Sequence, residues 1–234
     1  MINKLILCVT LFFIWCNGYA KNYQLTNSIC IKSEVEKDSL IIYKSDCNRS
    51  EYLLDEFQVP NDIPKIDFVF LENINNRKYI FLSISYSENY RDENNKINYA
   101  GKYHLNYVYQ CEKECKFDKK LSNFLGNGGN LVDISNNNIL YVFPYAIANN
   151  VKKDLNSNFF KDWINNKLKN GIIINKTEIY SDSGVDSKKL GYIIPGDKFN
   201  IVDVTSRWLK ISYKAKNKKT IIGWINCEST NVCS

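Results

Sequence analysis

The 234-residue chain is poor in the side chains that hydrolases use for acid–base and metal chemistry. It contains a single histidine, His104. A Cys–His peptidase needs a free thiolate beside a base, and a zinc amidase needs several histidine or carboxylate ligands. One histidine cannot supply either set. The sequence therefore predicts no metal site, no cofactor and no catalytic residue.

Other catalytic signatures are missing as well. There is no Gly-x-Ser-x-Gly elbow, and the GNGGN of residues 126–130 lacks the Lys-Ser/Thr of a nucleotide-binding loop. We place His104 on the solvent-facing side of a strand. A pair of carboxylates is the remaining enzymatic option, because two of them can cleave a glycoside. The acidic residues beside aromatic-rich strands are Glu72, Glu88, Asp92 and Glu93, and no spacing distinguishes them.

No apolar run is long enough to span a bilayer, and the longest run is at the N-terminus. Lys4 precedes the apolar segment 5–16, and Gly18 and Ala20 provide small residues at the two positions that a signal peptidase reads. A segment of this length is too short to span a bilayer but suits the core of a signal peptide. We expect residues 1–20 to be a signal peptide, with no membrane span after its cleavage. This predicts a periplasmic or extracellular protein, and an uncleaved anchor is the alternative.

Six cysteines remain after the expected cleavage, and they form three close pairs along the chain. An even number in an exported chain favours disulfides. Local pairing predicts the bonds Cys30–Cys47, Cys111–Cys115 and Cys227–Cys233. A zinc site is the weaker interpretation, because Cys111 and Cys115 have no second pair at zinc-ribbon spacing.

The positive charge is concentrated in the C-terminal part. The whole chain has a net charge of +6, and residues 172–234 hold ten Lys and Arg against six Asp and Glu, a net +4. In an exported protein, such an excess favours an acidic surface or an anionic cell-wall polymer as partner over nucleic acid.

Strand patterns dominate residues 21–171. Runs at 29–35 and 39–44 predict a hairpin whose open end can hold the first disulfide. Runs at 66–71 and 79–86 flank Asn75-Asn76 and predict a second hairpin, with both arms buried on both faces. A strand follows in which Tyr103, Leu105, Tyr107 and Tyr109 share one face. After the turn at 126–130, residues 131–134 and 138–145 predict another strand pair.

One segment has a helical period. Phe160, Trp163, Ile164 and Leu168 recur at three- and four-residue spacing. Asn156 or Ser157 can cap the start, and Gly171 can stop the helix. We expect this one amphipathic helix to pack on the N-terminal sheet and to end an N-terminal domain at residue 171.

Residues 172–234 predict a second, smaller domain of five short strands. The segments "IYSDSG", "GYIIPGDKFNIVD", "RWLKISY" and "GWIN" occur in an order that resembles the bacterial SH3-like domain over residues 172–229. The resemblance implies a small β-barrel. It also implies that the module binds peptides or cell-wall material, or supports another domain.

Two groups of side chains are candidates for ligand binding in this module. Exposed aromatics on a small barrel can form a shallow groove for an extended peptide, and the candidates are Tyr180, Tyr192, Trp208 and Trp224. The alternative is that the two tryptophans close the ends of the barrel. The second group is a lysine cluster at a hairpin tip, Lys214, Lys216, Lys218 and Lys219. The alternative is that these lysines are solvated and bind no ligand.

The sequence thus predicts a mainly β protein, with a disulfide-containing N-terminal domain, one helix and a C-terminal SH3-like barrel. We expect an exported, non-catalytic binding protein of the cell envelope that recognises a protein or a cell-wall peptide through its β surfaces. An immunity-type protein that neutralises a secreted toxin is one form of this hypothesis. A peptidoglycan-anchoring module is the alternative, and a glycoside-cleaving hydrolase is less favoured.

Overall fold

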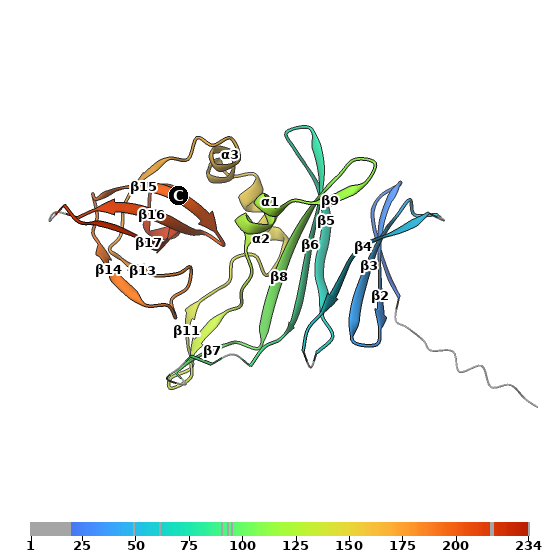
Figure 1. The fold of residues 1–234 in the computed structure, drawn as a ribbon, viewed down its shortest axis with the longest axis horizontal. Helices are drawn as coiled ribbons and strands as arrows, with labels where there is room; N and C mark the ends of the chain where they lie inside the picture. The colour runs from blue at the N-terminus through green and yellow to red at the C-terminus, as the bar shows by residue number, and fades with distance from the viewer. Residues whose placement is uncertain are drawn as a thin grey trace, which may run out of the picture.

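The computed structural model describes residues 20–48, 50–60, 62–89, 91–92, 94, 96–215 and 218–233. The expected signal peptide, apart from Ala20, and the candidate residues Glu93 and Lys216 lie outside this part of the chain. The described residues form four antiparallel sheets, with helices between the central and C-terminal sheets (Figure 1). None of their helices combines the length and apolarity that crossing a bilayer requires.

The first sheet is an antiparallel meander at the N-terminal end of the molecule. Its strands are β1 (Lys21–Thr26), β2 (Ile29–Glu36), β3 (Ser39–Ser45) and β4 (Glu51–Gln58), in that order across the sheet. Strands β2 and β3 form the predicted hairpin. The disulfide between Cys30 and Cys47 lies at its open end, as expected.

The second sheet is central in the molecule. Its strands are β5 (Lys65–Ile74), β6 (Arg77–Ser87), β8 (Lys102–Cys111) and β9 (Cys115–Phe117), in the order β5-β6-β8-β9. Asn75 and Asn76 both have positive φ, 51° and 64°, which is the geometry of a two-residue hairpin turn. The Cys111–Cys115 disulfide closes the β8–β9 hairpin. Both features confirm the sequence-based predictions.

Strand β6 is buried on both faces from Tyr79 to Ser85 because each of its faces lies in a different core. Ile80, Leu82 and Ile84 pack with residues of the first sheet. Tyr79 and Phe81 pack on the opposite side, toward the helices and the C-terminal sheet. The expectation that both hairpin arms are buried on both faces is right for β6 and wrong for β5. Strand β5 is at the edge of the sheet, and most of its side chains are only half-buried.

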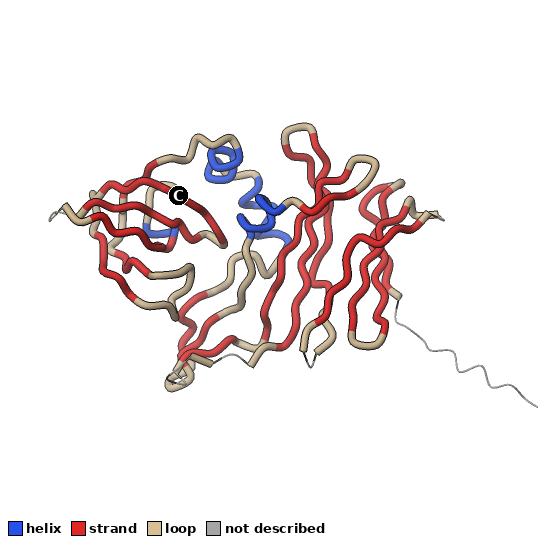
Figure 2. Tube along the Cα trace, viewed as in Figure 1, coloured by secondary structure: helices blue, strands red, loops and turns tan. Residues whose placement is uncertain are grey.

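Three helices are present where one was expected. They are α1 (Lys119–Leu125), α2 (Ala148–Leu155) and α3 (Asn158–Ile164), and they lie between the central and C-terminal sheets (Figure 2). The side chain of Ser157 caps α3, as predicted, by accepting a hydrogen bond from the Phe160 amide at 3.1 Å. The helix ends at Ile164 rather than at Gly171. Helices α1 and α2 were not predicted, although Leu121, Phe124 and Leu125 of α1 recur at three- and four-residue spacing.

The third sheet is a small three-stranded arm. It contains β7 (Ile97–Tyr99), β10 (Leu131–Asp133) and β11 (Asn138–Tyr141), in the order β11-β10-β7. Strands β10 and β11 are the pair predicted after the glycine-rich turn. Gly128 in that turn pairs with His104 on β8, which ties the turn to the central sheet.

The C-terminal sheet contains the five predicted strands and one more. They are β12 (Asn170–Ile172), β13 (Thr177–Tyr180), β14 (Lys189–Ile193), β15 (Lys198–Thr205), β16 (Trp208–Lys214) and β17 (Thr220–Asn226). The order is β12-β15-β16-β17-β13-β14, and the described strands do not close into a barrel. A short 3₁₀ helix, Cys227–Ser229, follows. The Cys227–Cys233 disulfide completes the predicted set.

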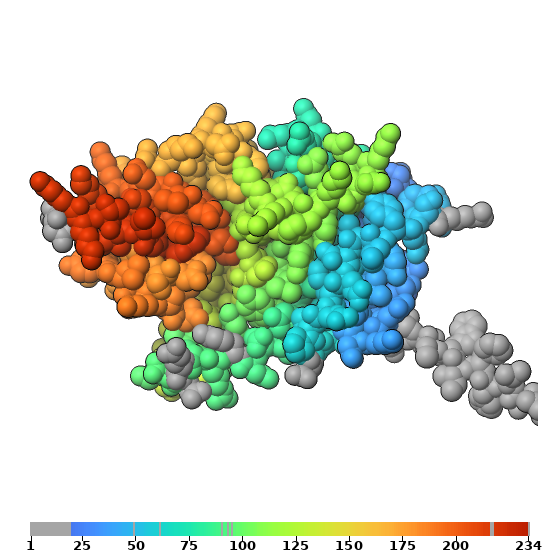
Figure 3. Space-filling model, in the orientation of Figure 1, coloured from blue at the N-terminus to red at the C-terminus, as the bar shows by residue number. Residues whose placement is uncertain are grey.

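The C-terminal sheet docks on the rest of the molecule through the turn between β15 and β16. Ser206 and Arg207 both have positive φ and form this turn. The Ser206 amide donates to the carbonyl of Phe124, and its hydroxyl donates to the carbonyl of Leu125. One continuous apolar core contains Phe81 of the central sheet and Ile211 of the C-terminal sheet. The space-filling view shows the two regions in direct contact (Figure 3).

Candidate binding groove

The strongest candidate site is a groove where two neighbouring strands diverge. The ladder between β15 and β16 extends from Thr205↔Trp208 to Asn200↔Ser212. Beyond that point, Lys198 of β15 pairs with β12, and Lys214 of β16 pairs with β17. The two pairs of strands therefore separate, and the space between them is a groove of ≈ 630 Å³. This volume is within the range typical of small-ligand sites.

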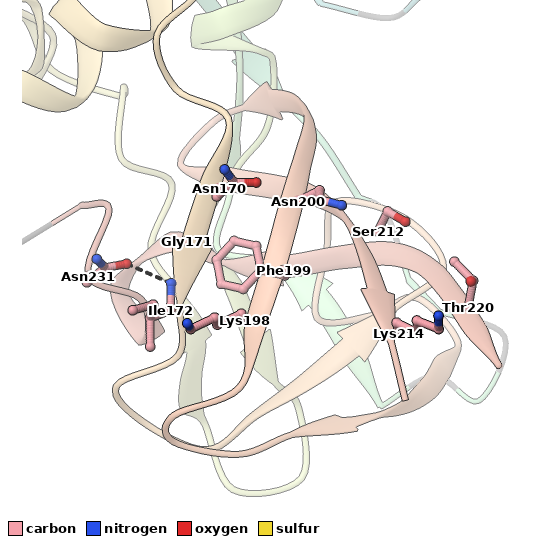
Figure 4. A pocket seen from close by; sticks show the side chains of 10 residues that line it. All are labelled: Asn170, Gly171, Ile172, Lys198, Phe199, Asn200, Ser212, Lys214, Thr220 and Asn231. Atoms are coloured by element: carbon pink, nitrogen blue, oxygen red, sulfur yellow. Dashed lines mark hydrogen bonds between the residues drawn. The ribbon is translucent and has the colours of Figure 1, made fainter. Parts of the chain in front are cut away.

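The lining of the groove is polar and positively charged. It includes three amides, two hydroxyls and two lysines, namely Asn170, Asn200, Asn231, Ser212, Thr220, Lys198 and Lys214. No carboxylate is among the lining residues. Figure 4 shows Asn170 and Asn200 together at one end, with Lys198 and Lys214 on different sides. This arrangement suits a ligand with carboxylates and peptide groups.

The floor and one wall of the groove are set by close packing. A Cβ on Gly171 would lie 2.3 Å from the Phe199 ring and 2.7 Å from Val232, so only glycine fits there. Phe199 is buried beneath the groove. The side-chain oxygen of Asn231 accepts a hydrogen bond from the Ile172 amide at 2.8 Å (Figure 4). The backbone amide of Asn231 donates to the Ile172 carbonyl at 3.0 Å. These contacts fix β12 and hold the wall in place.

A hydrogen bond spans the diverging strands on the inner side of the sheet. The hydroxyl of Tyr213, on β16, donates to a carboxylate oxygen of Asp197 at 3.0 Å. Asp197 stands in the turn Pro195-Gly196-Asp197, where Gly196 has φ of 88° and the Asp197 amide donates to the Ile194 carbonyl. This hydrogen bond therefore fixes the separation between β15 and β16.

The four predicted aromatic residues do not form an open groove of their own. Trp208 is 1% exposed and packs against Tyr141 and edge-on against Tyr180. Trp224 pairs with Tyr180 across β17 and β13 and is half-buried beneath the Lys210 ammonium. Trp208 therefore belongs to the interior and offers no free surface to a ligand.

Tyr192 is separate from this aromatic group. It stands on β14, is 60% exposed, and has the Lys176 ammonium 4.6 Å from its ring centroid. It is the most exposed of the four predicted aromatic side chains, and it lines no part of the groove.

The predicted lysine cluster is divided by the structure. Lys214 lines the groove, whereas Lys218 and Lys219 are exposed on the β16–β17 hairpin beyond it. Lys216 lies outside the described residues. Lys198, which the sequence did not single out, is a second cation at the groove.

His104 does not lie on the surface, and that expectation is wrong. It is 8% exposed, its ring stacks on Phe143, and its Nδ1 is 2.9 Å from a carboxylate oxygen of Asp67. Ser85 donates to the other oxygen of the same carboxylate at 2.9 Å. Although burial raises the pKa of Asp67, the hydrogen bonds from His104 and Ser85 outweigh it and hold that pKa below its ordinary value. The serine bonds to the carboxylate rather than to the histidine, unlike a catalytic triad.

The described carboxylates that were considered for glycoside cleavage lie on different elements of the fold. Asp92 accepts hydrogen bonds from the amides of Lys96 and Ile97, which organises the loop before β7. The bond from the Ile97 amide is the main cause that lowers the pKa of Asp92. Glu72 stands on the edge strand β5, opposite Tyr79. Glu88 follows β6, and Glu93 lies outside the described residues.

Sequence reasoning missed most of the groove because its residues are single polar side chains on strands. The available signal was alternation. Lys198 and Asn200 alternate with buried Phe199 on β15, and Ser212 and Lys214 flank buried Tyr213 on β16. Alternation identifies an outward face but not the point at which two strands separate. Comparison of the chain with models of protein families, with curated proteins and with solved structures finds no match.

Proposed function

We propose that this chain is an exported, non-catalytic binding protein of the cell envelope. The groove between β15 and β16 binds an extended, acidic segment of another protein or of a cell-wall peptide. The observation that carries this proposal is the lining: Lys198 and Lys214 stand where the strands diverge, with amides and hydroxyls between them. The lysines attract carboxylates, and the amides and hydroxyls bond to peptide groups.

The diverging strands themselves support a peptide ligand. Where the ladder between β15 and β16 ends, neither strand supplies the other with backbone hydrogen bonds. An extended peptide in the groove satisfies such backbone groups, as in other cases of strand addition. Side chains then provide selectivity through the two lysines.

We further propose that the C-terminal sheet is an SH3-like module. Five strands occur at the segments that carry the resemblance. The tight turns at Pro195-Gly196-Asp197 and Ser206-Arg207 support this proposal, because short turns of this kind join the strands of small barrels. The module holds the groove, and its docking on the helices braces the N-terminal sheets.

Export is part of the proposal and has independent support. All three predicted disulfides are present, at Cys30–Cys47, Cys111–Cys115 and Cys227–Cys233. Bonds of this kind persist in oxidising compartments. A protein ligand in that compartment, including a secreted toxin that the chain neutralises, fits the groove as well as a wall peptide does.

Charge reversal in the groove tests the proposal. The mature protein is immobilised and incubated with an envelope extract, and in parallel it is sedimented with purified peptidoglycan. We expect one of these to capture a partner, and the variants Lys198→Glu and Lys214→Glu to lose it. Lys78→Glu makes the same charge change at an exposed position on the central sheet and should retain binding. Absence of any partner, or binding unchanged in both groove variants, would contradict the proposal.

A further inference from the structure

Strand β11 is the uncovered edge of the three-stranded arm. It pairs with β10 on one side, and no described strand pairs with its other side. The opposite edge of the arm is different, because Arg91 bridges to Asn98 of β7. The short edge strand β12 is also covered, by a bridge from Thr230 to Ile173 beside it. An open edge exposes backbone N–H and C=O groups that can pair with another strand.

The edge formed by β11 also lacks the charges that protect other edges. Charged residues occur in each of the edge strands β1, β4, β5, β9 and β14. Strand β11 has none, and the whole run from residue 134 to residue 151 is uncharged. Charged side chains on an edge strand discourage pairing with other chains. Among the edge strands of the described residues, β11 is therefore the one with neither a charged residue nor a bridge from another segment.

The side chains along β11 are apolar and exposed. Ile139 is 65% exposed and Leu140 42%, and Val142 just beyond the strand is 60% exposed. These side chains lie along one short edge segment, and the register of β11 on β10 shifts at Leu140, between the pairs Val132↔Ile139 and Leu131↔Tyr141. Ile147, at the start of α2, adds a further 55% exposed side chain. Concentrations of this kind mark interaction surfaces.

The edge is held in an extended form by its neighbours. The Tyr141 hydroxyl donates to the Ser206 carbonyl at 3.2 Å, and the Phe143 amide donates to the side-chain oxygen of Asn130 at 2.8 Å. The Asn138 amide is held by the side chain of Asn136 at 3.0 Å. Because the strand is already ordered, pairing with another strand costs little conformational entropy.

We propose that β11 pairs antiparallel with β11 of a second copy of this chain, across a two-fold axis. The two arms then form one six-stranded sheet. A second copy fits because an uncharged strand meets itself without like-charge repulsion, and a two-fold axis makes the antiparallel pair self-complementary. Each exposed apolar side chain gains an apolar neighbour. Figure 1 shows the arm at the lower margin of the molecule.

Sedimentation velocity over a concentration series tests the pairing, with the mature protein and its disulfides intact. We expect a monomer–dimer equilibrium for the wild type. Leu140→Lys and Ile139→Lys should be monomeric over the same series, because the two-fold axis places each new charge in the interface twice. Val202→Lys and Ile222→Lys serve as controls, since these side chains are 59% and 57% exposed on the C-terminal sheet. Both controls should dimerise like the wild type.

Hydrogen exchange identifies the interface directly. Amides of residues 138–142 should become more protected as the wild-type concentration rises, and this change should be lost in Leu140→Lys. A wild type that stays monomeric throughout would overturn the proposal. So would a dimer that persists in Leu140→Lys without added protection of residues 138–142. All the substituted side chains are exposed, so the variants should keep the wild-type circular dichroism spectrum.

Discussion

A guanidinium nitrogen of Arg207 lies 2.7 Å from a carboxylate oxygen of Asp154. The two residues are far apart in sequence, one in the β15–β16 turn and the other on α2. The other oxygen of Asp154 accepts the hydroxyl of Tyr145 at 2.7 Å, and Arg207 also donates to the Cys233 carbonyl at 3.3 Å. Burial, together with the Asp154 carboxylate, raises the pKa of Tyr145 well above its ordinary value. This cluster joins the C-terminal sheet to the helices.

Removing one partner of this pair should destabilise the protein strongly. We expect Asp154→Asn to cost about 3 kcal/mol of unfolding free energy, because Arg207 would be left with a poorly compensated charge. Denaturant unfolding at neutral pH, without reductant, measures the cost. Glu51→Gln is the control, since it breaks the more exposed Lys32–Glu51 pair and should cost about 0.5 kcal/mol. Equal losses in the two variants would show that the buried pair has no special role.

A methyl group at Gly126 should also disturb this junction. Its Cβ would lie 2.2 Å from the Ser206 hydroxyl oxygen and 2.5 Å from that of Thr205. Gly101 is the matched control, because its φ is also positive but nothing lies within 4 Å of its Cβ position. We expect Gly101→Ala to cost about 1 kcal/mol from backbone strain alone. Gly126→Ala should cost at least twice as much, measured by thermal or denaturant unfolding, and a cost no larger than that of the control would contradict the clash.

The Asp67–His104 contact predicts a loss of stability in acid. The folded state lowers the pKa of Asp67, so the unfolded state binds its proton more readily. The contribution to stability is present above the ordinary pKa of about 4 and is lost as pH falls through the folded value. Unfolding free energies measured between neutral pH and about pH 3 should fall less steeply for Asp67→Asn than for the wild type. Glu36→Gln, at an exposed position, should follow the wild-type curve.

The Cys227–Cys233 disulfide should protect the wall of the groove. It anchors the segment in which Thr230 and Asn231 cover β12. We expect the double variant Cys227→Ser/Cys233→Ser to lose about 2 kcal/mol of stability. Amide exchange at residues 170–172 should accelerate more than the global loss explains. The double variant Cys111→Ser/Cys115→Ser should leave exchange at 170–172 at the rate set by global stability, and a similar local increase in both variants would contradict this role.

Local sequence patterns predicted the hairpins and disulfides because the causes are local. The Asn75-Asn76 turn and the paired cysteines each depend on residues close together in the chain. Helices α1 and α2 were missed because each is very short, and helices of this length depend on tertiary packing for their stability. Phe124 of α1, for example, is buried against Trp163 and Tyr145.

The sites depended on long-range contacts and were therefore harder to predict. His104 was expected on the surface because the sequence does not show that Phe143 and the turn at Gly128 cover that face. Trp208 was considered for a ligand site, yet Tyr141 from the arm packs against it. The groove arises where the ladder between β15 and β16 ends while each strand stays paired on its other side, which no local pattern of either strand encodes.

The hydrophobic core shared by the central and C-terminal sheets determines whether the chain can be divided into independent fragments. One hydrophobic core contains Phe81 and Val108 of the central sheet together with Leu209 and Ile211 of the C-terminal sheet. Division of the chain at residue 171 would expose a large apolar surface on each fragment. We therefore expect neither fragment to fold stably on its own or to serve as a transferable domain. Heating should melt the C-terminal sheet and the central sheet together, as one cooperative event.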